Sequence, residues 1–260
     1  MSQAFAPSAE LIPASKLAQV SSNAPRWRPG LAPAFHNEVF APGAEASGAA
    51  AALAFAVDAL RGAAAAHTAD ADDRRALVWV QDRAALKLGG RPYRPGLPKM
   101  LRDRLIHVLC ETCEDALFAL EETLHCRDVA GVIGEVAGNP RAFDFTASRR
   151  LTLSAERHGI PLWLVRLDAA HDLSSARMRW DVRSARSPHP RWNAAAPGTP
   201  SWHGELFRAR MHPPGKWTLR DDGHVLSADR IAEPDPQREP ATPYPLGLAF
   251  AAGDRSLAPG

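Results

Sequence analysis

Two glycines of this 260-residue sequence stand at a spacing that could bind the phosphates of a nucleotide. Gly43 and Gly48 follow the apolar run FHNEVF and precede an alanine-rich stretch, an order that predicts a strand, a glycine loop and a helix. In a working loop of this kind, backbone N–H groups hold the phosphates, a lysine reaches the β and γ oxygens, and a hydroxyl binds magnesium. Ala49 and Ala50 stand where that lysine and that Ser or Thr would be, and Glu45 adds a negative charge. The pattern therefore predicts a degenerate nucleotide loop, with no ATPase activity and no nucleotide cofactor.

Two other combinations of residues suggest catalytic or metal chemistry only at first sight. His107, Cys110, Cys113, His125 and Cys126 include a C-x2-C pair. If 113–126 forms one helix, its ends lie roughly 20 Å apart, which is too far for both to bind one zinc ion. Packed cysteines are the simpler interpretation. The sequence also contains no G-x-S-x-G element that would expose a nucleophilic serine. We therefore expect no metal site and no catalytic residue.

Basic residues concentrate in the second half of the chain. Between Arg141 and Arg220, thirteen Arg and one Lys stand against six acids, a local net charge of +8. Within residues 176–192, Trp180 and Trp192 stand among five arginines, as in surfaces that bind phosphates and stack bases. On that interpretation, contacts to DNA or to an acidic partner would come from Arg177, Arg179, Trp180, Arg183 and Arg186. The alternative is a half-exposed strand that buries Met178, Trp180 and Val182 and presents its arginines to solvent.

The hydrophobic pattern that must position these residues is that of an α/β protein. Buried strands are predicted at 35–40, 76–82, 104–110, 129–136 and 160–167. Helices are predicted between them, at 48–61 with Gly62 as its stop, at 113–126 capped by Thr112, and after Asp144 or Thr146 up to Gly159. The segment 87–101 is rich in Gly and Pro and predicts little regular structure. Shorter strands follow, so we expect a mostly parallel sheet flanked by helices, with antiparallel C-terminal strands.

Composition divides the chain into three parts. Residues 1–30 read as an N-terminal arm and linker, with one apolar helix stripe formed by Leu11, Leu17 and Val20. Residues 31–220 form the core domain, and residues 221–260 are a Pro-rich tail that we expect to be disordered. The longest near-apolar run, Gly48 to Val57, is only ten residues long, too short to span a membrane. With three cysteines and no pattern of a secretory signal, the expected location is cytoplasmic.

Several stretches resemble the RecA-type ATPase core and, within that group, the ImuA family. ImuA-like proteins are accessory proteins of the bacterial translesion-synthesis mutasome and are related to SulA-like cell-division inhibitors. The resemblance covers residues 31–220, and its most specific parts are the FDFTASRRL helix and the final strand with its G-x-W pattern. The residues that carry it are FHNEVFAPGAEASGAA, ALVWVQDRAALKLGGRPYRPGL, EDALFALEETLHCRDVAGVIGEV, FDFTASRRLTLSAERHGIPLWLVRL, SSARMRWDVRSA and ELFRARMHPPGKWTLR.

The resemblance implies a RecA fold that has lost its ATPase. Glu135 matches the Walker B carboxylate, and Arg83 falls near the position of the glutamate that activates water in RecA proteins. The implied role is that of a non-catalytic adaptor in SOS-induced, error-prone DNA synthesis and repair. Its implied partners are a polymerase-like ImuB-type protein and an error-prone replicative-type polymerase, and RecA itself is a further candidate, reached through the N-terminal arm. The resemblance leaves open a SulA-like inhibitor of the tubulin-like division protein, as well as direct DNA binding.

Overall fold

The computed structural model describes residues 35–66, 74–190, 193, 195–223 and 225–231, and the structural statements below concern these residues. All of them except Ile231 belong to one unit of the chain, which ends at Arg230. The predicted arm, with Leu11, Leu17 and Val20, and residues 232–260 of the predicted tail lie outside the described residues.

The described strands form a single nine-stranded sheet in the order β3-β2-β4-β5-β1-β6-β7-β8-β9. The first six strands of that order run parallel, whereas β7, β8 and β9 continue the sheet as antiparallel neighbours. The prediction of a mostly parallel sheet with an antiparallel C-terminal part is thus confirmed. The strands are β1 (His36–Ala41), β2 (Ala76–Asp82), β3 (Leu105–Cys110), β4 (Val129–Ala137), β5 (Leu162–Leu167), β6 (Met178–Ser184), β7 (Ser201–Ala209), β8 (Gly215–Asp221) and β9 (Leu226–Arg230).

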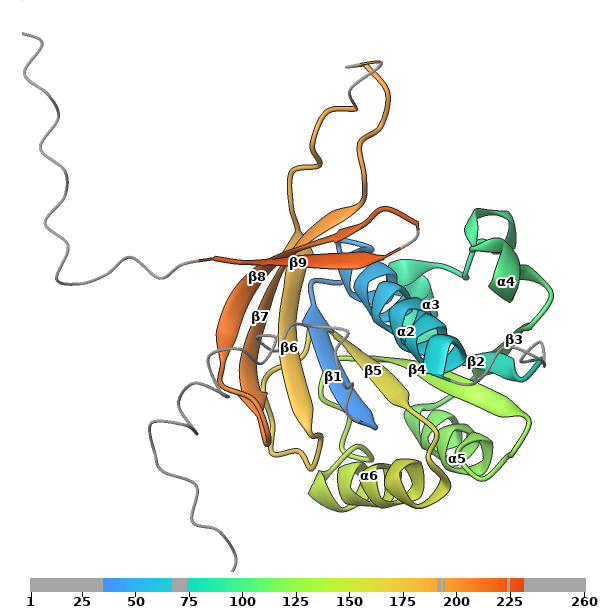
Figure 1. The fold of residues 1–260 in the computed structure, drawn as a ribbon. Coiled ribbons are helices and arrows are strands. Elements are labelled where there is room, and N and C mark those ends of the chain that lie inside the picture. The colour runs from blue at the N-terminus through green and yellow to red at the C-terminus, as the bar shows by residue number, and fades with distance from the viewer. Residues whose placement is uncertain (1–34, 67–73, 191–192, 194, 224, 232–260) are drawn as a thin grey trace, which may run out of the picture. The chain divides into compact units, whose positions relative to one another are not determined.

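Helices cover both faces of the parallel part of the sheet (Figure 1). On one face lie α2 (Ser47–Ala66), α3 (Arg83–Gly89), the 3-10 turn η1 (Arg94–Gly96) and α4 (Lys99–Arg102); on the other lie α5 (Cys113–Thr123) and α6 (Phe145–His158). Local sequence fixes the ends of the last two. Thr112 and Asp115 form a capping box at the start of α5, and Asp144 accepts from the Ala147 amide at the start of α6. Gly159 ends α6 in the left-handed region, with a φ of 67°.

The core on the α2 side extends from the parallel strands to the antiparallel ones. Small residues of α2 are buried against the sheet, which lets the helix approach closely. Farther along, the Phe55 ring lies 5.3 Å from that of Trp180, and Trp180 lies 5.6 Å from Trp217 of β8. The Arg61 guanidinium donates to the Gly223 carbonyl at 2.7 Å, and the Leu226 amide donates to Asp58. The antiparallel strands are therefore tied to the same helix as the parallel ones.

Four features differ from their predictions. Helix α2 continues through Gly62 to Ala66, because a glycine inside a helix costs only about 1 kcal/mol relative to alanine and need not end it. The segment 87–101, where little regular structure was expected, holds the end of α3, the turn η1 and most of α4. Strand β9 pairs with β8 inside the stretch that we expected to be a disordered tail, so the sheet continues beyond residue 220. Helix α5 ends at Thr123, before the exposed Cys126.

Gly48 allows α2 to start directly on the sheet, and this can be tested. A Cβ atom at residue 48 would lie 2.7 Å from Ala41 Cβ and 2.9 Å from Val165 Cγ1. We expect Gly48→Ala to lower the free energy of unfolding by about 1–3 kcal/mol through overpacking, measured by urea denaturation. Gly62→Ala is the matched control, because nothing lies within 4 Å of its added Cβ, and it should be neutral or stabilising by up to about 1 kcal/mol. Equal effects of the two substitutions would contradict this account.

Candidate functional site

The glycine loop lies where a phosphate loop belongs, between β1 and α2. Parallel strands of an α/β sheet carry their ligand sites beyond their carboxyl ends, and this loop leaves β1 at that end. Gly43 is buried, and Ser47 and Gly48 form the buried start of α2. The predicted order of strand, loop and helix is therefore confirmed, and the chemical question is what the loop's backbone amides contact.

A carboxylate of the same chain occupies the inside of the loop. The Gly43 amide donates to Asp168 Oδ1 at 2.8 Å, and a Cβ at residue 43 would lie 2.5 Å from Asp168 Oδ2. Asp168 follows the end of β5 and has a φ of 51°, in the left-handed region that Asp tolerates better than most residues. Its amide donates to the Ala41 carbonyl at 3.1 Å. The anion that this amide binds is thus supplied by the protein itself.

Glu45 adds a second carboxylate, and it has a structural partner. Its Oε2 accepts from the Ser184 amide at 2.9 Å and from the Ser184 hydroxyl at 2.8 Å, at the end of β6. The hydrogen bond from the Ser184 amide is the largest cause that lowers the pKa of Glu45, so this side chain stays ionised near neutral pH. One carboxylate within the loop and one bonded to it would therefore repel a phosphate.

Ala49 and Ala50 stand where a functional phosphate loop has its lysine and its Ser or Thr, and here they pack against apolar side chains. Both are partly buried, and both pack against the hydrophobic core of the α2 side. Their methyl groups offer neither a charge for a triphosphate nor a ligand for magnesium. Among the residues that the structure describes, no cluster of three or more His, Cys, Asp or Glu could hold a metal ion.

Glu135, the predicted Walker B carboxylate, is hydrogen-bonded to side chains of β2. It lies on the α2 face of β4, in register with Val165 of β5, and its own neighbour on the other side is Gln81 of β2. Trp79 Nε1 donates to Glu135 Oε1 at 2.7 Å, and Gln81 Nε2 donates to Oε2 at 3.0 Å. Burial is the main cause that raises the pKa of Glu135 to about 7. The carboxylate is thus bonded within the β2–β4 pair, and Arg83, next to β2, forms an exposed ion pair with Glu111.

The predicted arginine-rich contact surface is dispersed by the fold. Met178, Trp180 and Val182 are buried on the α2 side. This confirms the alternative prediction of a strand that buries these three side chains. Arg179 is only 3% exposed and Trp180 only 2%, so neither presents its side chain at the surface. Arg177 forms a two-point ion pair with Glu156 of α6, at 2.5 and 2.8 Å. Of the five residues, only Arg183 and Arg186 are exposed.

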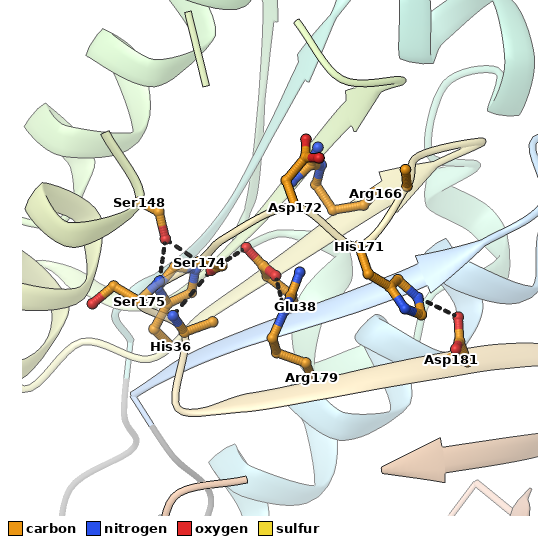
Figure 2. A network of polar contacts seen from close by, with 12 residues as sticks. His36, Glu38, Ser148, Arg166, His171, Asp172, Ser174, Ser175, Arg179 and Asp181 are labelled. Carbon is orange, nitrogen blue, oxygen red and sulfur yellow. Dashed lines mark hydrogen bonds and ion pairs between the residues drawn. The ribbon is translucent and has the colours of Figure 1, made fainter. Parts of the chain in front are cut away.

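Arg179 belongs to a buried polar network beneath α6 (Figure 2). Its Nε donates to Glu38 Oε2 at 2.7 Å, and this ion pair joins β6 to β1 with both side chains almost fully excluded from solvent. The Ser174 hydroxyl donates to Glu38 Oε1 at 2.6 Å. Because its proton is used there, the Ser148 hydroxyl must donate to Ser174 at 2.8 Å, and it accepts in turn from the Ser175 amide.

His36 extends this network without becoming a catalytic base. Its Nδ1 lies 2.7 Å from the Thr152 hydroxyl, which donates to the Ser148 carbonyl, so Nδ1 must carry the proton that bonds Thr152. Burial is the main cause that lowers the pKa of His36 to about 4, and the ring is therefore neutral at physiological pH. His36 and Glu38 are both 0% exposed, so no substrate can reach them. The network holds β1, β6 and α6 together.

Two signals in the sequence could have indicated the contacts that the prediction missed. His36 and Glu38 are ionisable residues two positions apart in a central strand that is buried throughout, a pattern that demands buried partners. Asp168 directly follows a buried parallel strand, and the carboxyl ends of such strands meet at one edge of the sheet. What no local pattern could provide is the strand order, which brings β5 and β6 to the two sides of β1.

Comparison with known proteins adds no assignment to this geometry. No family model matches the sequence, and no curated protein matches it. Within the described part of the chain, no helix is both long and apolar enough to cross a bilayer.

The buried ion pair can be tested by removing one partner. We expect Arg179→Met to lower the free energy of unfolding by about 3–5 kcal/mol, because it leaves the Glu38 carboxylate buried without a counter-charge. The double variant Glu38→Gln with Arg179→Met should recover much of that loss, because the Gln carbonyl still accepts from Ser174. Arg183→Met serves as control, since this exposed arginine of the same strand should change stability by about 0.5 kcal/mol or less. A loss below about 1 kcal/mol for Arg179→Met would show that the pair does not hold β1 to β6.

Proposed function

We propose that this protein is a non-catalytic adaptor built on a RecA-like fold, with a role in SOS-induced translesion DNA synthesis and DNA repair. The observation that carries the first half of this proposal is the hydrogen bond from the Gly43 amide to Asp168. A loop that binds its own carboxylate has no free place for a phosphate, so the frame of a nucleotide site serves as a structural element.

Support for a RecA-like fold comes from the position of the loop and from the strand order. The G-x4-G spacing joins the first parallel strand to a helix, as in phosphate-loop proteins. The order β3-β2-β4-β5-β1-β6 differs from the 3-2-1-4-5-6 and 2-1-3-4-5 orders of the two common doubly wound nucleotide-binding folds. A carboxylate in the fourth strand, Glu135, is buried on the same face as the loop helix.

The missing chemical groups argue for an adaptor over an enzyme. From Gly43 to Ala50 the loop has no Lys or Arg. Its one carboxylate, Glu45, and the Asp168 carboxylate that it binds are both bonded within the protein, and Glu135 is held by Trp79 and Gln81. Catalysis of phosphoryl transfer depends on positioned cations, and removing one such group typically costs two to three orders of magnitude in rate. Without these groups, a chain of this fold acts through its surfaces.

The resemblance to ImuA-like proteins supplies the partners in this proposal. They are a polymerase-like ImuB-type protein and an error-prone replicative-type polymerase, with RecA as a further candidate. Contacts of this kind need no nucleotide, which agrees with a closed loop.

The proposal is tested by recovering the tagged full-length protein, with its bound partners, from DNA-damaged cells. We expect the polymerase-like protein to be recovered, and its yield to stay the same after nuclease treatment and after removal of nucleotides with apyrase. Undamaged cells provide the control for damage dependence. Recovery of the tubulin-like division protein in its place would support the SulA-like alternative, and loss of all partners after apyrase would contradict a nucleotide-independent adaptor.

A further inference from the structure

Four arginines converge on a pocket far from their places in the sequence. Arg149 of α6, Arg177 just before β6, and Arg208 and Arg210 at the end of β7 line a pocket of about 400 Å³. Its other walls are formed by Phe145, Ala209 and the segment Ser174–Ala176. None of the lining residues is an Asp, Glu, Asn or Gln, so the lining itself provides cations, hydroxyls and backbone groups but no carboxylate.

The positions of these arginines are fixed by the fold. The Arg210 amide donates to the Arg177 carbonyl at 3.0 Å, which holds the end of β7 beside the start of β6. Arg177 is held in turn by its two-point ion pair with Glu156. In the β6–β7 register, Arg208 stands opposite Arg179, whose charge is already matched by Glu38. The pocket is therefore a built feature of α6, β6 and β7.

This arrangement has a cost that an anion would remove. Arg149 and Arg208 have no hydrogen-bond or ion-pair partner among the described residues. Four arginines and the nearby Glu156 leave a net charge of +3 around the pocket. Elsewhere in the described part of the basic half, Arg150, Arg220 and Lys216 are each paired with an acid. Arg141, Arg157, Arg183 and Arg186 are not paired in this way, but none of them lines this pocket. The concentration of unpaired arginine at one pocket points to an anionic ligand.

We infer that this pocket binds the phosphate backbone of single-stranded nucleic acid. Guanidinium groups bind phosphate oxygens two at a time, which suits a pocket whose cations are all arginine. Phe145 lies in the lining and its side chain is 46% exposed, so it offers a ring on which a base can stack. Because the arginines are used here on phosphate oxygens, which every nucleotide carries, the binding is independent of sequence. This inference does not rest on the adaptor proposal, which concerns a different part of the molecule.

The site differs from the surface that the sequence predicted. Of the five residues of that surface, only Arg177 lines the pocket, whereas Arg183 and Arg186 lie outside it. The two surfaces can therefore be tested separately by substitution. Arg183 and Arg186 serve as the control for Arg149 and Arg208.

The test is fluorescence anisotropy of a labelled oligo(dT) of about 15 nucleotides with the full-length protein, over a series of salt concentrations. With about three phosphate contacts, the slope of log K against log salt should be near −2. Arg149→Ala with Arg208→Ala should make that slope shallower by about 1.4 and weaken binding about tenfold or more at low salt. The lysine pair at the same positions should keep most of the slope, and Arg183→Ala with Arg186→Ala should change it little.

Phe145→Ala separates stacking from charge. It should weaken binding by about fivefold or more with an unchanged salt slope, because it removes a ring and no cation. Melting curves of all variants check that they fold.

Four results would overturn the inference. They are no binding of oligo(dT) at about 50 mM salt, equal losses for the two alanine pairs, competition by inorganic phosphate as strong as by the oligonucleotide, and equally strong competition by poly-glutamate at matched charge. The third result would indicate a site for free phosphate, and the fourth a site for an acidic protein segment.

Discussion

The buried ion pair between Glu38 and Arg179 is the interaction on which the arrangement of this molecule depends. It joins the central strand β1 to β6, the strand at which the parallel sheet passes into its antiparallel extension. Through Ser174, the same carboxylate also fixes the segment that connects β5 to β6. That segment begins at Asp168, which closes the glycine loop, and ends at Arg177, which lines the arginine pocket. A buried charge pair of this kind gains little free energy overall, but losing one partner is costly, so it selects one arrangement over others.

The segment from Asp168 to Arg177 disfavours an anion at its first end and favours one at its second. At the loop, the N–H group that would bind a phosphate bonds the Asp168 carboxylate, and Glu45 adds a further negative charge that is fixed by Ser184. At the pocket, several arginines are brought together with fewer acids than would neutralise them. The fold thus places a carboxylate of the chain at the loop amide and concentrates positive charge elsewhere. An adaptor that contacts nucleic acid through a fixed surface needs no nucleotide cycle.

Local patterns in the sequence predict the elements well, but they do not predict which side chains meet. The capping residue Thr112, the αL glycine Gly159 and the alternation of Met178, Trp180 and Val182 all act within a few residues, and the sequence predicts each of them. The cap of α6, Asp144, is one of the two residues predicted for that place. The glycine loop was recognised for the same reason. The bond from Gly43 to Asp168 spans 125 positions, and the pair of Glu38 and Arg179 spans 141. Both depend on strand order, and so does the meeting of Arg149 with Arg208, which no local pattern in the sequence could indicate.

The most direct test of the claim that the glycine loop is a structural element is the Gly43 amide itself. We would record its NMR chemical shift and its hydrogen-exchange rate while Mg-ATP is added to millimolar concentration. The structure predicts an amide that is protected by its bond to Asp168 and whose shift and exchange rate do not change as nucleotide is added. A saturable shift of the Gly43 and Gly48 amides with added Mg-ATP would show that a phosphate displaces the carboxylate, and that the loop still binds nucleotide.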